Sequence, residues 1–142
     1  MEGIKIMSQL PYTQDYIVAQ VGQIADISDR TIDSFAAEGT IAFGIAVARG
    51  TNKQKQVIPF AGSGFVGISV FTHNGVGEYA DETSVPVMTS GRIYVTTATT
   101  VTAGTTAYAV NANGAITNVS TDATAIGKFL TSGTGLVVLE LN

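Results

Sequence analysis

The chain has 142 residues, 45% of them hydrophobic and only 13% charged, so it is long enough to bury the core of one domain and too apolar to remain unfolded. Its net charge of −4 and its scattered basic residues argue against a nucleic-acid partner. The lack of cysteine excludes a disulfide framework and a cysteine nucleophile, and no continuous apolar run is long enough to predict a membrane span.

The first 39 residues are predicted to form an N-terminal arm. Residues 21–39 carry four acidic side chains and one arginine, and their apolar residues recur irregularly. We interpret this part as an arm or long loop with one strand over Tyr16–Val21, and the alternative is a short helix capped by Ser28. The arm (1–39) is expected to pack on a β body (40–142) within a single structural domain.

The residues from Thr40 onward predict strands. Ile41–Ala48 is a short apolar run rich in β-branched residues, and Val57–Ala61 and Phe65–Thr72 follow it. None of these segments has the 3.6-residue period of an amphipathic helix. The first half of the body is therefore expected to consist of short strands joined by glycine-containing turns.

The second half of the body predicts hairpins. Ser90-Gly91 separates two alternating segments, Asn113-Gly114 is typical of a primed turn, and Gly133-Thr134-Gly135 joins the last two segments. Turn residues recur about every eight to twelve residues, which is typical of all-β domains. We therefore expect a mainly β fold, either an antiparallel β-sandwich of jelly-roll-like form or a barrel, with an extended N-terminal arm.

Residues 62–67 read Gly-Ser-Gly-Phe-Val-Gly and match the pattern G-x-G-x-x-G of dinucleotide-binding turns. In those folds the third glycine opens a helix whose amides hold the pyrophosphate, whereas Ile68–Thr72 alternates in the manner of a strand. Asp81 lies about twenty residues further on, where a ribose-binding acid would stand, but in a polar loop. We interpret the glycines as allowing a turn, a bulge and a close approach of strands, and we expect no cofactor.

Other catalytic or metal-binding patterns are also missing. His73 is the only histidine, so a transition-metal site would need three oxygen ligands from elsewhere. Asp81 and Glu82 are adjacent and point apart on an extended chain, which is unsuited to paired acid–base work. Ser63 lacks the G-x-S-x-G pattern of a nucleophile elbow. We expect a protein that is not an enzyme and holds no metal.

Five segments taken in order suggest a family: IAFGIAVARGT, VIPFAGSGFVGISV, YADETSVPVMTSGRIYVTT, VTAGTTAYAV and AIGKFLTSGTGLVVLELN. This series resembles the small cement, or head decoration, proteins of tailed bacteriophages over about residues 11–142. The resemblance implies a β-rich protein of the virion that sits on the outer face of the head. It implies a homotrimer that clamps neighbouring subunits of the major capsid protein. The charge and the lack of a long apolar run lead us to expect no nucleic-acid or membrane partner.

Two sets of residues are candidates for these contacts. The thinly apolar arm is the candidate capsid-facing element, and a flexible terminus is the alternative interpretation. Its candidate residues are Tyr12, Tyr16, Ile17, Val18, Val21, Ile24 and Ile27. Two late strands are candidates for the trimer interface, and burial in the protein's own core is the alternative for each side chain. These residues are Ile93, Tyr94, Val95, Leu136, Val138 and Leu141.

The N-terminus lacks the basic start and continuous apolar run of a signal peptide, which predicts synthesis in the host cytoplasm. A different class of function, a sugar-binding or adhesin β-domain of a phage tail fibre, is the alternative. The loop from His73 to Glu82 offers Asn74, Tyr79 and Asp81 for such a site, although the chain has no tryptophan. A third alternative, a hydrolase, has little support because the chain has a single histidine to serve as a catalytic base.

Overall fold

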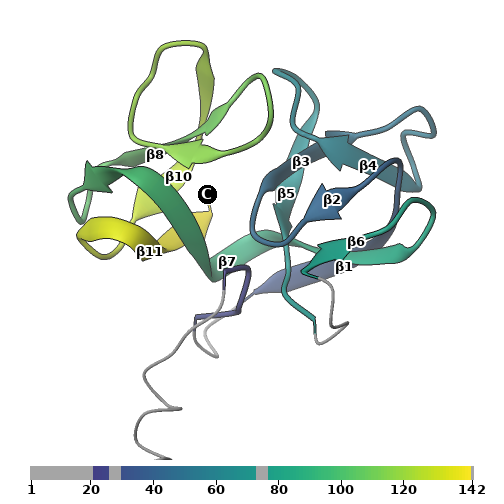
Figure 1. The fold of residues 1–142 in the computed structure, drawn as a ribbon, viewed down its shortest axis with the longest axis horizontal. Helices are drawn as coiled ribbons and strands as arrows, with labels where there is room; N and C mark the ends of the chain where they lie inside the picture. The colour runs from purple at the N-terminus through teal and green to yellow at the C-terminus, as the bar shows by residue number, and fades with distance from the viewer. Residues whose placement is uncertain (1–20, 26–29, 73–76, 142) are drawn as a thin grey trace, which may run out of the picture.

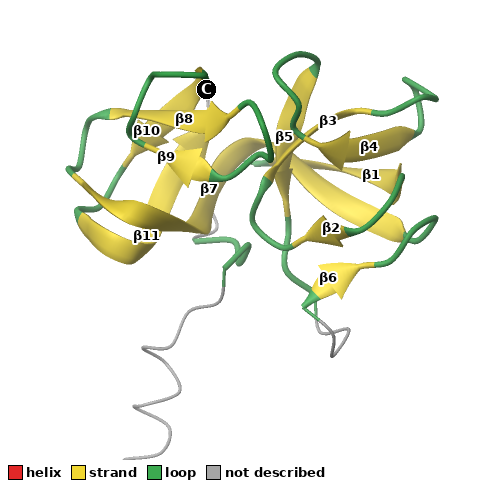
Figure 2. Ribbon diagram, turned by 45° about the horizontal axis from the view of Figure 1, so that its top comes forward, coloured by secondary structure: helices red, strands yellow, loops and turns green. Residues whose placement is uncertain are grey.

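The computed structural model describes residues 21–25, 30–72 and 77–141. Within these ranges the chain forms strands and no helix, so the prediction of a mainly β fold is confirmed (Figure 2). The strands are β1 (Thr31–Ala37), β2 (Ile41–Ala42), β3 (Ala46–Arg49), β4 (Gln56–Pro59), β5 (Phe65–Ser69), β6 (Glu78–Tyr79), β7 (Ser84–Val101), β8 (Thr106–Val110), β9 (Ile116–Thr117), β10 (Ala123–Phe129) and β11 (Gly133–Leu141).

Nine of these strands form one sheet that closes on itself twice. Their order is β1-β4-β3-β5-β7-β11-β10-β8-β9, and additional pairings join β1 to β7 and β7 to β9. The sheet therefore makes two barrel-like rings that share β7, and they appear as two lobes in Figure 1. We call the ring of β1, β4, β3, β5 and the start of β7 the N-terminal lobe. The ring of β11, β10, β8, β9 and the rest of β7 is the C-terminal lobe.

The prediction of a hairpin at Ser90-Gly91 is wrong, because both residues lie inside the shared strand β7. The strand runs without interruption for 18 residues, pairing with β1 up to Ser90 and with β11 from Gly91 onward. Gly91 is needed for a different reason, because a Cβ atom there would lie 2.7 Å from Cβ of Arg30. Its φ of +128° also lies in a region that favours glycine. The two alternating segments are thus one strand that passes from lobe to lobe.

Two other predicted turns differ in detail. Of the predicted primed-turn pair, only Gly114 has a positive φ, because residues 111–115 form a longer loop in which the Gly114 amide donates to Val110 O. The last hairpin, β10–β11, turns before Gly133, and Gly133 and Gly135 flank a register shift inside β11. The predicted strand Ile41–Ala48 is split by a turn at Phe43-Gly44. Local turn signals therefore located the loop at Asn113-Gly114 and the last hairpin approximately, but they missed the turn at Phe43-Gly44 and indicated a turn at Ser90-Gly91 where the strand continues.

The glycine-rich segment 62–67 forms a turn followed by a strand, as predicted. Gly62 and Gly64 have positive φ values in the connection between β4 and β5, and Gly67 lies within β5. A register shift in the β3–β5 pairing places a bulge beside Gly67. A Cβ atom on Gly67 would lie 2.0 Å from Met88 O, so this glycine permits β5 to approach β7 closely.

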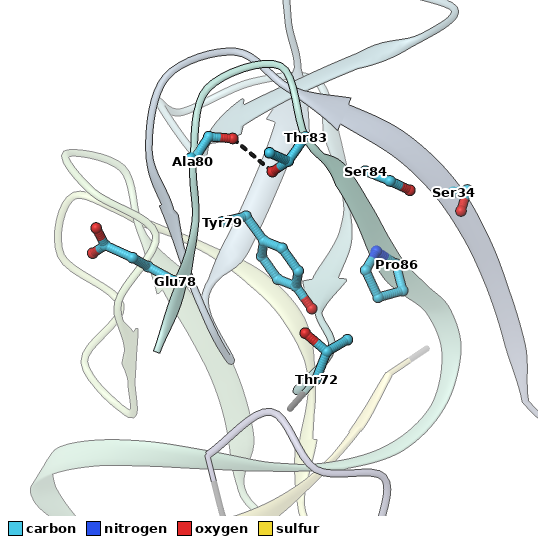
Figure 3. A pocket seen from close by; sticks show the side chains of 8 residues that line it. All are labelled: Ser34, Thr72, Glu78, Tyr79, Ala80, Thr83, Ser84 and Pro86. Carbon is cyan, nitrogen blue, oxygen red and sulfur yellow. Dashed lines mark hydrogen bonds between the residues drawn. The ribbon is translucent and has the colours of Figure 1, made fainter. Parts of the chain in front are cut away.

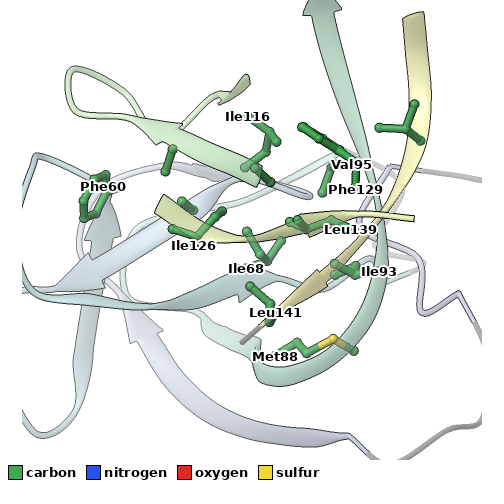
Figure 4. Packing of buried hydrophobic residues seen from close by; sticks show 14 of the residues in the cluster. Phe60, Ile68, Met88, Ile93, Val95, Ile116, Ile126, Phe129, Leu139 and Leu141 are labelled. Atoms are coloured by element: carbon green, nitrogen blue, oxygen red, sulfur yellow. The ribbon is translucent and has the colours of Figure 1, made fainter. Parts of the chain in front are cut away.

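The hydrophobic core has two parts, one of which joins the lobes. The larger cluster fills the C-terminal lobe and extends onto Ala46, Ala48, Ile68 and Met88, which lie on strands of the N-terminal lobe (Figure 4). The smaller cluster fills the N-terminal lobe around Val47 and its neighbours. Residues 46–48 of β3 are therefore buried on both faces, which explains why all three are apolar, whereas Arg49 at the end of the strand is exposed.

The alternative of a short helix that begins at Ser28 does not continue into residues 31–37, because these residues form strand β1. Ser28 itself and residues 16–20 of the predicted strand Tyr16–Val21 lie outside the described residues. Val21 lies in a turn.

Candidate functional site

The outer surface of β7 and β11 in the C-terminal lobe carries the exposed side chains that the sequence proposed for a subunit interface. In this antiparallel pair Val138 lies opposite Tyr94, and Leu136 lies opposite Thr96. Paired residues share a face of the sheet, and both pairs are more exposed than their neighbours along each strand. We call Tyr94, Thr96, Leu136 and Val138 the outer C-terminal face. Leu136 is 41% exposed, which is unusual for a leucine in a strand.

Charged side chains flank one end of this face. Arg92 and Glu140 are paired across β7 and β11, and Arg92 Nε lies 3.3 Å from Glu140 Oε2. Both side chains are about 40% exposed, so this ion pair contributes little to stability. Lys128 of β10 lies opposite Glu140 on its other side. An uncharged centre beside a charged margin is the usual anatomy of a protein–protein contact surface.

Hydroxyl and amide groups border the other end. The Thr100 and Thr134 hydroxyl oxygens are 2.7 Å apart across β7 and β11. Asn118 accepts a hydrogen bond from the Thr99 hydroxyl and donates one to Thr100 O, at 2.9 and 3.0 Å. These bonds fix the polar side chains around the outer C-terminal face, so the face is presented on a rigid sheet.

The remaining candidates for the trimer interface are interior residues. Ile93 and Val95 alternate with Tyr94 on β7 and have no exposed surface, and Leu141 is 5% exposed. All three belong to the larger core cluster (Figure 4). Core packing in the C-terminal lobe accounts for them, which leaves Tyr94, Leu136 and Val138 with surface to offer to a partner.

Residues 21–25 join both lobes, and we call them the clasp. Gly22 and Ala25 donate backbone hydrogen bonds to Tyr94 O and Arg92 O, at 2.7 and 3.0 Å. In return, the clasp carbonyls of Gln23 and Gly22 accept bonds from the amides of Tyr94 and Phe71 at 2.8 and 2.7 Å. The clasp thus lies between β7 and the residues that follow β5.

The clasp also contains two of the candidate capsid contacts. Val21 packs against the smaller core cluster and Ile24 against the larger one. Both side chains are half-buried, so much of their apolar surface is used within the protein. The other candidates in the arm, Tyr12, Tyr16, Ile17, Val18 and Ile27, lie outside the described residues. Sequence periodicity missed the clasp because its contacts are made with residues far along the chain.

A cavity of about 520 Å³ lies beside β6, and Tyr79 is its central side chain (Figure 3). The Tyr79 hydroxyl donates to Val70 O, and its ring packs edge-on against Phe43 with the ring centres 5.0 Å apart. Burial raises the pKa of Tyr79, and a hydrogen bond with the Thr72 side chain partly opposes this rise. The cavity is lined by Ser34, Thr72, Glu78, Tyr79, Ala80, Thr83, Ser84 and Pro86.

The described side chains that the sequence proposed for a sugar site, Tyr79 and Asp81, make contacts within the protein. Tyr79 is only 4% exposed, so its ring is a core residue and offers no stacking surface. Asp81 Oδ1 accepts a hydrogen bond from the Gly39 amide at 2.8 Å, and Glu82 occupies a tight turn with a φ of +66°. His73 and Asn74 lie outside the described residues. The part of the loop that is described holds the turn before β7 in place.

No three His, Cys, Asp or Glu side chains gather among the described residues in a way that could hold a metal ion. No helix in that part of the chain is long and apolar enough to cross a membrane.

Comparison with known proteins identifies one matching family and several similar chains in solved structures. The family model described as "Structural cement protein (E217 gp24/Pam3 gp6)" matches residues 7–142. No curated protein sequence matches the chain. A chain from the structure "The capsid of Myoviridae Phage XM1" is 18% identical, with a TM-score of 0.72 over 87% of this chain and 90% of that chain. A chain from "The crystal structure of head fiber gp8.5 N base in bacteriophage phi29" is 13% identical, with a TM-score of 0.48 over 80% of this chain and 95% of that chain.

Proposed function

Because the chain belongs to the family of phage structural cement proteins, we propose that it binds the outer surface of a phage head as a trimer and clamps neighbouring major capsid subunits. The family is a structural one, so the protein is a capsid-associated component of the virion. The observation that carries the proposal is the outer C-terminal face, an exposed and uncharged surface on a rigid sheet.

The trimer requires two different surfaces on each copy. A three-fold ring is built from heterologous contacts, in which one patch meets a different patch on the next subunit. The outer C-terminal face supplies one of these patches, and Leu136 is its exposed large hydrophobic side chain. The N-terminal arm supplies the contact with the capsid in this proposal, and of its described residues the clasp at 21–25 and β1 are used within the protein's own fold.

Clamping stabilises the shell through mass action. The protein binds the assembled shell and not its separated subunits, so each occupied site adds to the free energy needed for disruption. At a free concentration of about 100 times the dissociation constant, that contribution is roughly 2.7 kcal/mol per site. Repetition over the many sites of a shell makes the effect large.

The direct test uses expanded empty heads that lack this protein. Adding the purified chain is expected to saturate the heads and to raise the temperature at which they disrupt, measured by calorimetry and electron microscopy. A chain that lacks residues 1–20 is expected to bind more weakly. The proposal is wrong if the full chain does not bind, or if it saturates the heads without raising that temperature. Binding to glycans in place of heads would favour the tail-fibre alternative.

Replacing Leu136 by glutamate is expected to prevent trimer formation without unfolding the protein. The side chain is 41% exposed, so a carboxylate there is solvated in the single chain but would be buried and unpaired in an interface. Light scattering at micromolar concentration measures the mass of each form. Val119→Glu is the matched control, because Val119 is also an exposed apolar side chain, at 47%, and lies outside the defined face. If the wild type and Leu136→Glu have equal masses, this face is not part of the trimer interface.

A further inference from the structure

The loop at residues 111–115 links the C-terminal lobe to the N-terminal lobe. The Gly114 carbonyl oxygen accepts a hydrogen bond at 3.0 Å from the amide of Ala46, the first residue of β3. A Cβ atom on Gly114 would lie 2.4 Å from Ala46 O, so glycine is required for this close approach. We call residues 111–115 the brace, because they connect the two lobes separately from the clasp.

The brace contains an asparagine that is followed by glycine. In spontaneous deamidation the backbone nitrogen of the next residue attacks the side-chain carbonyl carbon of an asparagine. A side chain on that next residue hinders the attack, and glycine has none. The residues that follow the described asparagines are Lys53, Ala112, Gly114 and Val119. Asn113 is therefore the described asparagine whose neighbour hinders the attack least.

The Asn113 side chain is exposed, and only its oxygen is held in place. Asn113 Oδ1 accepts a hydrogen bond from the Ala115 amide at 3.0 Å. Such a donor stabilises the negative charge that the oxygen gains during the attack, as the donors of an oxyanion hole do. The side-chain nitrogen, which must leave as ammonia, has no hydrogen-bond partner among the described residues. The side chain is thus activated at its carbonyl and free at its leaving group.

A backbone hydrogen bond of the brace opposes the reaction while the fold is intact. The Gly114 amide donates to Val110 O at 2.9 Å, and its nitrogen must give up this bond and its proton before it can attack. Gly114 is also buried, which keeps water and hydroxide away from that proton. Conversion therefore requires a local opening of the brace.

We propose that Asn113 is a site of spontaneous deamidation, gated by opening of the brace, and that its products loosen the contact between the lobes. The Gly114 nitrogen loses its proton to hydroxide and forms a bond with Asn113 Cγ. The bond from Cγ to the side-chain nitrogen breaks, and this nitrogen takes a proton from water and leaves as ammonia. The resulting succinimide ring takes up one water molecule. Opening at one ring carbonyl gives aspartate, and opening at the other gives isoaspartate.

Both products change the brace. Each adds a carboxylate to residues 93–121, a stretch that contains no charged residue. Isoaspartate also inserts a methylene group into the main chain just before Gly114. The Gly114 carbonyl is then displaced from the Ala46 amide, and the close approach of the two backbones leaves no room for a compensating shift. Because the protein is a component of the virion, whose subunits are not replaced, converted chains accumulate as a particle ages.

Peptide mapping by mass spectrometry measures the reaction in the full chain held at mildly alkaline pH, as a mass gain of about 1 Da at the converted residue. We expect conversion at Asn113 to be at least about tenfold faster than at Asn118, which corresponds to a barrier lower by about 1.4 kcal/mol. Asn118 is the matched control in the same molecule, because it is also exposed but Val119 follows it. Equal rates at the two residues would overturn the proposal.

The same mapping in urea tests the gating by the brace. Conversion at Asn113 is expected to be faster in the unfolded chain than in the folded one, and equal rates would overturn the gating. The chain has a second such pair, Asn74-Gly75, outside the described residues, and cleavage after Arg92 places it in a separate peptide.

Thermal unfolding tests the effect on the lobes. Converted chains carry an additional negative charge, so ion exchange separates them from unconverted chains. They are expected to melt about 2–8 °C lower, the shift that the loss of one backbone hydrogen bond produces in a domain of this size. Asn113→Gln, incubated in the same way, is the control, because its longer side chain keeps the amide but closes the ring poorly. An unchanged melting temperature of the converted chains, or an equal fall for incubated Asn113→Gln, would overturn the loosening.

Discussion

Replacing Gly67 by alanine is expected to lower the free energy of unfolding by about 3 kcal/mol or more. A Cβ atom at this position would lie 2.0 Å from the Met88 carbonyl oxygen and 2.8 Å from its carbon. These are backbone atoms of β7, the strand that both lobes share, so they cannot rotate away as a side chain could. Overpacking of a core usually costs about 1–3 kcal/mol, and here either β5 must separate from β7 or their pairing must shift.

The matched control is Gly104→Ala in the connection between β7 and β8. Gly104 has a φ of +89°, but a Cβ atom there would meet nothing within 4 Å. Its replacement therefore carries only the penalty of a left-handed alanine, about 1–2 kcal/mol. Urea unfolding followed by circular dichroism measures both variants. Equal losses of stability for the two would show that close approach at Gly67 is unimportant.

Removing residues 1–27 is expected to destabilise the fold by about 3 kcal/mol or more, whereas removing residues 1–20 is expected to leave it intact. The longer deletion eliminates the clasp and its four backbone hydrogen bonds to Arg92, Tyr94 and Phe71. Each such bond contributes about 1 kcal/mol, and the apolar contacts of Val21 and Ile24 add to this. The total is a large part of the 5–15 kcal/mol that stabilises an ordinary domain.

Thermal unfolding of the full chain and the two truncated chains measures this effect. The shorter deletion is the control, because it shortens the arm without touching the clasp. If the chain that lacks residues 1–27 melts at the same temperature as the full chain, the clasp does not contribute to the fold. The comparison also determines which truncation can be used on capsids, since only a folded chain reports on the arm itself.

The class of fold could be predicted from the sequence because strand signals are local. β-Branched residues and frequent turn residues predicted strands from Thr40 onward, and the alternation after Gly67 was enough to argue against the dinucleotide motif. A period of two places Tyr94 on the opposite face of β7 from Ile93 and Val95. The prediction from sequence did not use this difference and kept all three as interface candidates, with core burial as the alternative for each.

Which strands pair with one another could be determined only from the tertiary structure. Ser90-Gly91 has the composition of a hairpin turn, yet the buried positions Val85, Val87, Ile93 and Val95 keep one phase of alternation across it. That phase is compatible with a continuous strand, and contacts from distant parts of the chain decided the outcome. Arg30 lies against Gly91. Strand β1 pairs with the part of β7 before Gly91, and β11 pairs with the part from Gly91 onward.

The sequence by itself determined that this is a β protein of a phage cement family, with its glycines placed at turns, a bulge and a close strand approach. Only the tertiary structure decided that one strand serves two lobes, that the clasp belongs to the fold and that, in the described part of the chain, β4 pairs with only the end of β1. The reason is physical: propensity and alternation depend on neighbouring residues, whereas the partner of a strand edge depends on which distant segments can reach it and close the sheet.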